Sequence, residues 1–234
     1  MFGQNVKNQN GGLTMKFQHS LIIPKESAAE VSGEGGNWRL EYEKGKFLSF
    51  IHLPKTGGIS IWDWVQKNFG ESNYWKSPHM PCSRMHEVYG KEDMDLGFVF
   101  GIIRNPYDWT VSRWAHYIAS RNHTPETLPF EKYLELSHVK DSEGLPEDPP
   151  RPKYHIEDFV SYLKGANYII RYEFLEDEFN LIKEMTGCYK ELGSMNVSKF
   201  RFGDKNYRKY YTPRCKEIVE TCYLDVIKEY NYEW

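Results

Sequence analysis

Short, almost continuously apolar runs mark the candidate strands of this chain. The run Lys46–Leu53 suits a buried strand, and the alternating segment Trp38–Glu43 precedes it across a Lys44-Gly45 turn. Later in the chain, Phe98–Arg104 and Tyr168–Arg171 have the same apolar character. The pattern therefore predicts a hairpin followed by two further strands.

Stretches with a helical period of apolar residues lie between and after these strands. Pro106 stands where one helix would start, and Thr212 and Pro213 suit the cap and first turn of the last one. The expected helices are Ser60 to about Phe69, Cys82–Tyr89, Tyr107–Ser120, His155–Leu163, Leu175–Met185 and one from Pro213 onward. Strands that alternate with helices predict an α/β fold with a mostly parallel sheet and helices on both faces.

Two parts of the chain lack this periodicity. Residues 1–36 are expected to form a loose leader, with one short strand near Phe17–Ile23. Residues 141–154 contain four prolines and four acidic residues, which excludes a regular element there. Because the α/β pattern continues on both sides of this segment, we expect one domain over residues 37–234, with an active-site loop over residues 121–154.

Composition excludes several classes of protein. Hydrophobic residues make up 40% of the 234 residues and aromatic residues 16%, which supports a sizeable core and is unlike a disordered chain. The formal net charge is −3, so the chain lacks the general basic surface that binds duplex nucleic acid. Any anion site therefore has to be local. The four cysteines show no Cys-x-x-Cys spacing, which argues against a zinc or dithiol site.

The chain also shows no membrane signature. No stretch reaches the roughly 18 consecutive apolar residues of a membrane span. The first residues lack the apolar centre of a signal peptide. On these grounds we expect a soluble, intracellular protein with no membrane span.

The most specific signal joins a buried strand to a helix and reads Leu53-Pro54-Lys55-Thr56-Gly57-Gly58-Ile59-Ser60. Glycines at such a joint let backbone N–H groups approach an anion, and the helix N-terminus adds partial positive charge. Lys55 supplies a full charge, and Thr56 and Ser60 supply hydroxyl groups. The segment therefore predicts a phosphate cradle. The alternative is an ordinary strand–turn–helix joint with a surface lysine.

The second signal is Arg104-Asn105-Pro106-Tyr107-Asp108, followed by Ser112. Arg104 ends a buried strand, at the edge where ligand sites gather in open α/β sheets. An arginine and a hydroxyl group can hold a second phosphate between them. The alternative is a structural ion pair between Arg104 and Asp108.

Together the two motifs resemble those of the sulfotransferase superfamily. Lys55–Ser60 is similar to the loop that binds the 5′-phosphosulfate, commonly PKTGGTS, and Arg104–Ser112 is similar to the 3′-phosphate motif, commonly RNPxDRxVS. Three later blocks also look like this superfamily, the last of them like its carbohydrate branch: Arg171–Phe179, Asn196–Lys199, and Tyr210–Pro213 with Tyr223 and Asp225. The resemblance covers roughly residues 47–234 and implies a single P-loop-like α/β domain.

The resemblance implies that the sulfuryl donor is 3′-phosphoadenosine 5′-phosphosulfate (PAPS), with adenosine 3′,5′-bisphosphate as product and no metal. The donor-binding residues that it implies are Lys55, Thr56, Gly57, Gly58, Ile59, Ser60, Arg104, Ser112, Ser198 and Lys199. Ile59 and Trp109 depart from the common pattern, which has threonine and a basic residue at these places. Many animal relatives begin with a Golgi anchor that this chain does not show. We therefore expect an enzyme of the cytoplasm of a bacterial or viral host cell, unless an anchor has been removed.

Sulfuryl transfer needs a positive charge at the departing oxygen and a base for the acceptor hydroxyl. Lys55 is the candidate for the charge. His79 is the candidate base, because histidine titrates in the right range and related sequences often have a histidine here. His52 is expected to be a packed core residue, and His86 is a competing base. A packing or capping role is the alternative for His79.

The expected acceptor is a hydroxyl group, on a glycan or glycoconjugate or on a small molecule, contacted by residues 121–154. The basic segment Lys199–Lys209 is a candidate lid over the donor, and a solvated loop is its alternative. A phosphoryl transferase is one rival function, but there the lysine follows the glycines and an acidic magnesium ligand is needed. A nucleotide- or glycan-binding protein with degenerate catalysis is the other rival.

Overall fold

The computed structural model describes residues 36–70, 74–77, 79–90, 95–139, 161–193 and 206–234. All of them lie within one compact unit, Val31–Trp234. The expected leader strand near residues 17–23 and the proline-rich segment 141–154 fall outside the described residues. Of the expected helix His155–Leu163, only residues 161–163 are described, and these are helical.

The described strands form one sheet in the order β3 (Tyr74–Ser77), β1 (Asn37–Glu43), β2 (Lys46–Ile51), β4 (Phe98–Ile103) and β5 (Tyr168–Arg171). The predicted hairpin is confirmed, because β1 pairs antiparallel with β2. The β2–β4 and β4–β5 pairings are parallel. Since β3 is antiparallel to β1, four of the five strands point the same way and β1 alone is reversed. The sheet is therefore mostly parallel in strand direction, as predicted, with a reversed second strand.

One face of the sheet is covered by α1 (Gly58–Phe69) and α7 (Asn180–Thr186). Their apolar residues pack on the β2 and β4 side chains in one continuous cluster. Within it, the Trp64 ring meets the Phe179 ring edge-on, with centroids 4.9 Å apart. Both side chains have a relative exposure of 0%. This packing anchors α1, whose first turn belongs to the candidate site.

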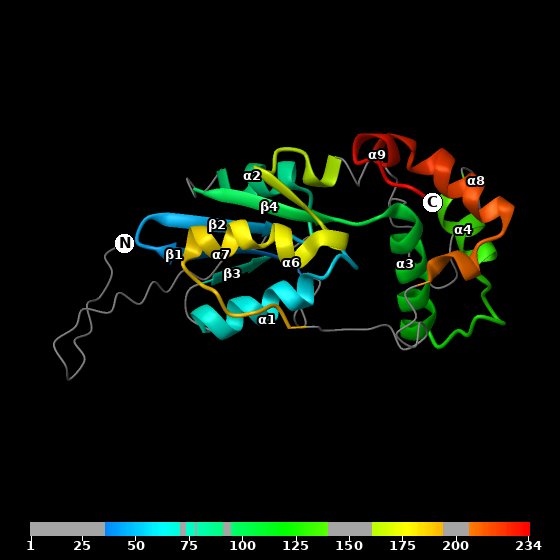
Figure 1. Ribbon diagram of the computed structural model, residues 1–234, viewed down its shortest axis with the longest axis horizontal. Coiled ribbons are helices and arrows are strands. Elements are labelled where there is room, and N and C mark those ends of the chain that lie inside the picture. The colour runs from blue at the N-terminus through cyan, green and yellow to red at the C-terminus, as the bar shows by residue number, and fades with distance from the viewer. Residues whose placement is uncertain (1–35, 71–73, 78, 91–94, 140–160, 194–205) are drawn as a thin grey trace. The chain divides into compact units, whose positions relative to one another are not determined.

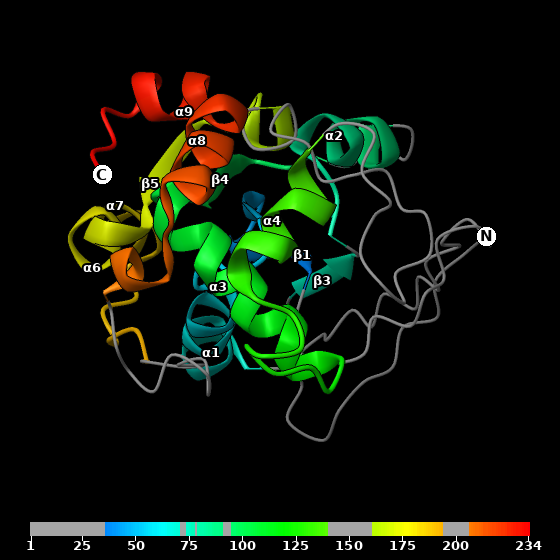
Figure 2. The ribbon, with the colours of Figure 1, turned by 90° about the vertical axis from the view of Figure 1, so that its right-hand side faces the viewer.

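The opposite side carries the other apolar cluster, to which α2 (Cys82–Gly90) contributes. Beyond the sheet end where β4 leads into the next helix, four helices gather, as Figures 1 and 2 show. These are α3 (Pro106–Ser120), α4 (Phe130–His138), α8 (Pro213–Cys222) and α9 (Leu224–Glu229). Among the described residues, none of the helices is long and apolar enough for a membrane crossing.

Two expected helices are interrupted. The expected helix Leu175–Met185 consists of α6 (Leu175–Glu178) and α7, and Phe179 between them is buried against the sheet. Gly187 ends α7 in the left-handed conformation, at φ 67°. The last expected helix divides into α8 and α9 at the buried Tyr223. Thr212 caps α8 as expected, since its hydroxyl accepts from the Cys215 N–H at 3.2 Å.

Candidate functional site

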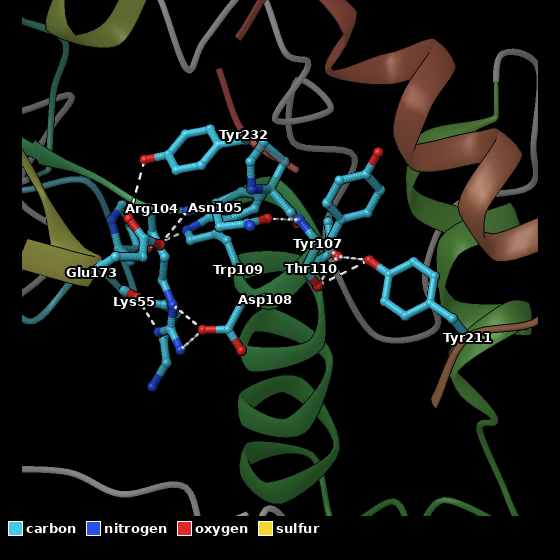
Figure 3. A network of polar contacts seen from close by, with 12 residues as sticks. Lys55, Arg104, Asn105, Tyr107, Asp108, Trp109, Thr110, Glu173, Tyr211 and Tyr232 are labelled. Carbon is cyan, nitrogen blue, oxygen red and sulfur yellow. Dashed lines mark hydrogen bonds and ion pairs between the residues drawn. The ribbon is translucent and has the colours of Figure 1, made fainter. Parts of the chain in front are cut away.

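Three strand ends place the candidate residues along one edge of the sheet. The segment after β2 runs through Lys55 into α1, and the segment after β4 runs through Arg104 into α3. The 3₁₀ turn Tyr172–Phe174 follows β5. Because β2, β4 and β5 are parallel neighbours, their carboxyl ends lie side by side. Figure 3 shows Lys55, Arg104 and Glu173 gathered at this edge.

The loop between β2 and α1 has an unusual backbone. Lys55 and Gly57 both have a left-handed conformation, with φ values of 69° and 88°. For a residue with a Cβ, this conformation costs about 1–2 kcal/mol. Inside the loop, the Thr56 hydroxyl donates to the Leu53 carbonyl at 2.6 Å and is fully buried. The loop is therefore a well-defined turn, held by an internal hydrogen bond, in which the Lys55 backbone is strained.

Helix α3 and Arg104, which precedes it, both hold the same loop by hydrogen bonds. The Trp109 indole Nε1–H donates to the Pro54 carbonyl at 2.8 Å. The Arg104 guanidinium donates to the Lys55 carbonyl at 2.9 Å. Trp109 is 5% exposed and so serves as a packed anchor of the loop. These bonds offset the backbone strain at Lys55.

Gly57 and Gly58 are required at these two positions for different structural reasons. Gly57 needs its left-handed φ, and a side chain there would also touch the Tyr172 ring at 3.2 Å. Gly58 is required by packing, because a Cβ on it would lie 2.0 Å from the Nε2 atom of His52. The packing reason at Gly58 is separate from the predicted approach of an anion. Glycine at position 58 makes room for an imidazole.

The N-terminus of α1 lacks a side-chain cap. Its N-cap residue is Gly57, which has no side chain, and among the described residues no side-chain hydrogen bond caps the helix. The first amides of a helix need partners, and an anion suits them because the helix dipole is positive there. Thr56 and Ser60 are buried and Ile59 is half-buried in this turn.

Arg104 forms an ion pair with Asp108, which the sequence analysis gave as the alternative to phosphate binding. It is 7% exposed, and its Nε–H donates to the Asp108 carboxylate at 2.7 Å. A second guanidinium nitrogen binds the same carboxylate oxygen. The centroid of the Tyr172 ring lies 4.2 Å from the guanidinium carbon of Arg104. Ser112 is buried further along α3, and in the described part of the chain no hydrogen bond joins it to Arg104.

His52 confirms the expectation of a packed core residue. Its side chain is 6% exposed and stacks on Phe50, with ring centroids 5.5 Å apart. Burial lowers its pKa to about 3, so the ring is neutral at physiological pH. Its Nδ1 accepts the Gly36 N–H at 3.2 Å, which leaves the ring proton on Nε2, facing Gly58.

His79 lies beside His52, and one hydrogen bond defines which of its ring nitrogens carries the proton. Its Nδ1 is 2.8 Å from the His52 carbonyl oxygen, and the ring centroids are 4.5 Å apart. Because a carbonyl can only accept, Nδ1 carries the proton, and in the neutral ring Nε2 is the acceptor. Desolvation lowers the His79 pKa, with the Arg113 charge acting in the same direction. The residue as a whole is exposed, as a base that meets a substrate has to be.

One further buried residue, Asn37, was not among the predicted site residues. It is fully buried at the start of β1, and its side chain accepts the His52 N–H at 2.9 Å. The same amide donates to the Met80 carbonyl at 2.8 Å, so it ties the His79 segment to the end of β2. Its partners are 15 and 43 residues away in sequence, so no local pattern indicates this role.

Glu173 is exposed and lies in the block Arg171–Phe179 noted in the sequence. Its carboxylate accepts the Asn105 N–H at 2.6 Å and the Tyr232 hydroxyl at 3.2 Å (Figure 3). The Asn105 side chain in turn caps α3 by accepting the Tyr107 N–H at 3.0 Å. Glu173 therefore holds the turn that carries Arg104.

Several of the expected site residues lie outside the described ranges. Ser198 and Lys199 lie outside the described residues, as does most of the candidate lid. Of residues 121–154, only 121–139 are described, and the prediction of a loop is wrong for Phe130–His138, which form the partly buried helix α4. His86 is exposed on α2. In the described ranges, no group of three or more histidine, cysteine or acidic side chains is arranged to hold a metal ion.

Comparison with known proteins identifies one relative, whose description gives no activity. A protein of Archaeoglobus fulgidus that is described as an uncharacterized protein is 30% identical over 132 residues, which are 56% of this chain and 98% of that protein. The chain belongs to the same family as this archaeal protein. No family model matches the chain. No solved structure matches it either.

Proposed function

We propose that this protein is a sulfotransferase that moves the sulfuryl group of PAPS to an acceptor hydroxyl, on a carbohydrate or glycoconjugate. The observation that supports the proposal is the uncapped N-terminus of α1, which follows Lys55, together with a histidine whose acceptor nitrogen is defined by its hydrogen bond. The P-loop-like character of the strand–loop–helix joint belongs to the same proposal.

PAPS has two anionic ends. For each end the site offers one cationic side chain and N–H or hydroxyl groups that can donate hydrogen bonds. Lys55 and the first amides of α1 would hold the 5′-phosphosulfate, with the backbone of Ile59 replacing the usual threonine hydroxyl. Arg104 and Ser112 would hold the 3′-phosphate. A guanidinium has five N–H donors, and within the described residues Arg104 uses three of them, on Asp108 and Lys55, which leaves two for a phosphate.

The chemistry requires one proton transfer and one displacement. His79 Nε2 would accept the proton of the acceptor hydroxyl while the acceptor oxygen bonds to sulfur. Lys55 would stabilise the charge on the oxygen that leaves with adenosine 3′,5′-bisphosphate. Burial, Arg104 and Arg113 lower the Lys55 pKa, and a bound anion would restore its preference for the charged form.

A binding protein without catalysis is the second candidate. Its specific support is the closed Arg104–Asp108 pair, with which a phosphate has to compete. Turnover separates the two functions, since both require the nucleotide to bind. A phosphoryl transferase is the weaker rival, because Lys55 precedes the glycines of the loop.

The test is calorimetry with adenosine 3′,5′-bisphosphate in metal-free buffer, followed by transfer of labelled sulfate from PAPS. We expect binding without magnesium, and Arg104→Ala should weaken it about 10- to 100-fold, the scale of a charged hydrogen bond. Arg84→Ala, which removes an exposed α2 ion pair with Glu87, is the control and should bind normally. No binding by the wild-type protein, or a strict need for magnesium, would contradict the proposal.

A further inference from the structure

The turn that carries Arg104 is held by the turn that follows β5. Arg104 and Asn105 join β4 to α3, and the Asn105 N–H donates to the Glu173 carboxylate at 2.6 Å. Glu173 belongs to the 3₁₀ turn after β5. In the same turn, the centroid of the Tyr172 ring lies 4.2 Å from the Arg104 guanidinium carbon. One turn therefore contacts both the side chain of Arg104 and the peptide group that follows it.

The segment Tyr232–Trp234 reaches the same place from a distant part of the chain. The Tyr232 hydroxyl donates to the second oxygen of Glu173 at 3.2 Å, as Figure 3 shows. The Asn105 side-chain amide donates to the Glu233 carbonyl at 3.3 Å, across 128 positions of sequence. Burial raises the pKa of the Tyr232 phenol, and the Glu173 charge adds to this effect, so the phenol keeps the proton that it donates.

Contacts outside the site fix this segment. The Tyr232 N–H donates to the Ile227 carbonyl of α9 at 2.9 Å. The Trp234 ring meets the Tyr107 and Tyr211 rings edge-on, with centroids 4.9 Å and 4.7 Å apart. Tyr107 belongs to the first turn of α3. The Tyr232 hydroxyl is therefore presented from a backbone that is attached to both α9 and α3.

Glu173 needs such a restraint. It is exposed on a turn of three residues, where water can replace its partners. A glutamate also loses rotamer freedom when it is held in one conformation. The Tyr232 hydroxyl binds one carboxylate oxygen while the Asn105 N–H binds the other, so it favours the rotamer that holds the turn. Loss of this hydroxyl would loosen the turn without touching Arg104 itself.

We propose that Tyr232 is a positioning residue, which acts through Glu173 and Asn105 to align Arg104 with the 3′-phosphate of the donor. Tyr232 acts only on the part of the site that Arg104 serves. Its removal therefore weakens the binding of a nucleotide that has a 3′-phosphate and spares one that lacks it. This inference rests on the proposed function and extends it to a residue that does not contact the donor.

The test uses two nucleotides that differ by one phosphate: adenosine 3′,5′-bisphosphate and adenosine 5′-monophosphate. Calorimetry measures both affinities for the wild type, Tyr232→Phe, Glu173→Ala and the double variant. Tyr230→Phe is the matched control, since it also removes one phenol hydroxyl, and the Tyr230 and Tyr232 rings stack with centroids 6.1 Å apart. Urea unfolding and the affinity for the 5′-monophosphate report on folding and on the rest of the donor site.

The Tyr232 hydroxyl should matter for one nucleotide only. We expect Tyr232→Phe to weaken bisphosphate binding about 3- to 10-fold, the scale of one hydrogen bond, and to keep the 5′-monophosphate affinity within about twofold. Glu173→Ala should weaken bisphosphate binding further, because it also releases the Asn105 N–H. Adding Tyr232→Phe to Glu173→Ala should change nothing more. Tyr230→Phe should bind both nucleotides as the wild type does.

Three results would overturn this inference alone. The first is unchanged bisphosphate affinity in Tyr232→Phe, and the second is an equal loss for both nucleotides, which would show a general effect on the fold. The third is a further loss when Tyr232→Phe is added to Glu173→Ala, because Tyr232 would then act by another route. Absence of bisphosphate binding by the wild type overturns the proposed function and this inference with it.

Discussion

Replacing Gly58 by alanine tests how the candidate site is packed. The added Cβ would lie 2.0 Å from His52 Nε2, and two ring carbons are nearly as close. The ring has little freedom to move away. It stacks on Phe50, its Nδ1 accepts the Gly36 N–H, and its backbone carbonyl binds His79. Either the first turn of α1 or the imidazole has to shift.

The expected loss follows from two opposing effects. The shift needed to reach an ordinary contact of 3.4 Å is about 1.4 Å. Overpacking of a buried site typically costs about 1–3 kcal/mol. Alanine itself favours a helical turn over glycine by about 1 kcal/mol. Because the required shift is large for a close-packed interior, overpacking dominates, and we expect Gly58→Ala to lose about 1–2 kcal/mol of unfolding free energy.

Urea unfolding of four variants isolates this effect. Gly90→Ala is the matched control, because Gly90 also lies in a helix and a Cβ there meets nothing within 4 Å. It should match or slightly exceed the wild type. His52→Ala removes the obstructing ring, so the double variant with Gly58→Ala should be more stable than the sum of the single losses predicts.

Two results would refute this reasoning. A Gly58→Ala protein as stable as Gly90→Ala would mean that the imidazole does not occupy this position. Strict additivity in the double variant would mean that the two residues do not meet. Gly58→Ala should also slow sulfate transfer, because the His52 carbonyl orients the proposed base.

Two further predictions concern the histidines. His79→Ala should lower turnover about 10²–10⁴-fold with nucleotide affinity unchanged, while His86→Ala on the exposed face of α2 should be normal; normal turnover in His79→Ala would exclude it as the base. Because the His52 pKa is about 3 in the folded protein and about 6.5 when unfolded, its neutral form stabilises the fold above pH 6.5, and this contribution is lost as the pH falls toward 3. Between pH 7 and pH 5 the wild type should lose about 2 kcal/mol more unfolding free energy than His52→Leu, and urea titrations with equal losses would contradict this.

Most of the sheet and the helix ends could be predicted from local pattern. The β1–β2 hairpin follows from alternation around a glycine turn, and the ends of α7 and α8 follow from Gly187 and Thr212. The break at Phe179 could not, because helical periodicity continues through it. It coincides with the burial of that ring against Trp64. Strand β3 escaped prediction because its four residues are defined by pairing with β1.

The site was predictable as two motifs but not as one arrangement. Parallel strands bring Lys55 and Arg104 to one edge, and this follows from the α/β pattern. The bonds of Asn37 span 15 and 43 residues, so no local rule contains them. The Arg104–Asp108 pair, by contrast, is a contact four residues apart on a helix start, and the sequence raised it as an alternative.

His52 connects the two halves of the proposed active site. Its ring presses on the first turn of α1, which would hold the donor, and its carbonyl fixes the tautomer of His79, which would act on the acceptor. A charged ring at this buried position would be costly, and its lowered pKa keeps the ring neutral when a negatively charged donor and a proton transfer are both nearby. Rate depends steeply on the alignment of reacting groups. The spacing between cradle and base would then be set by a close-packed core residue, which holds geometry better than an exposed loop.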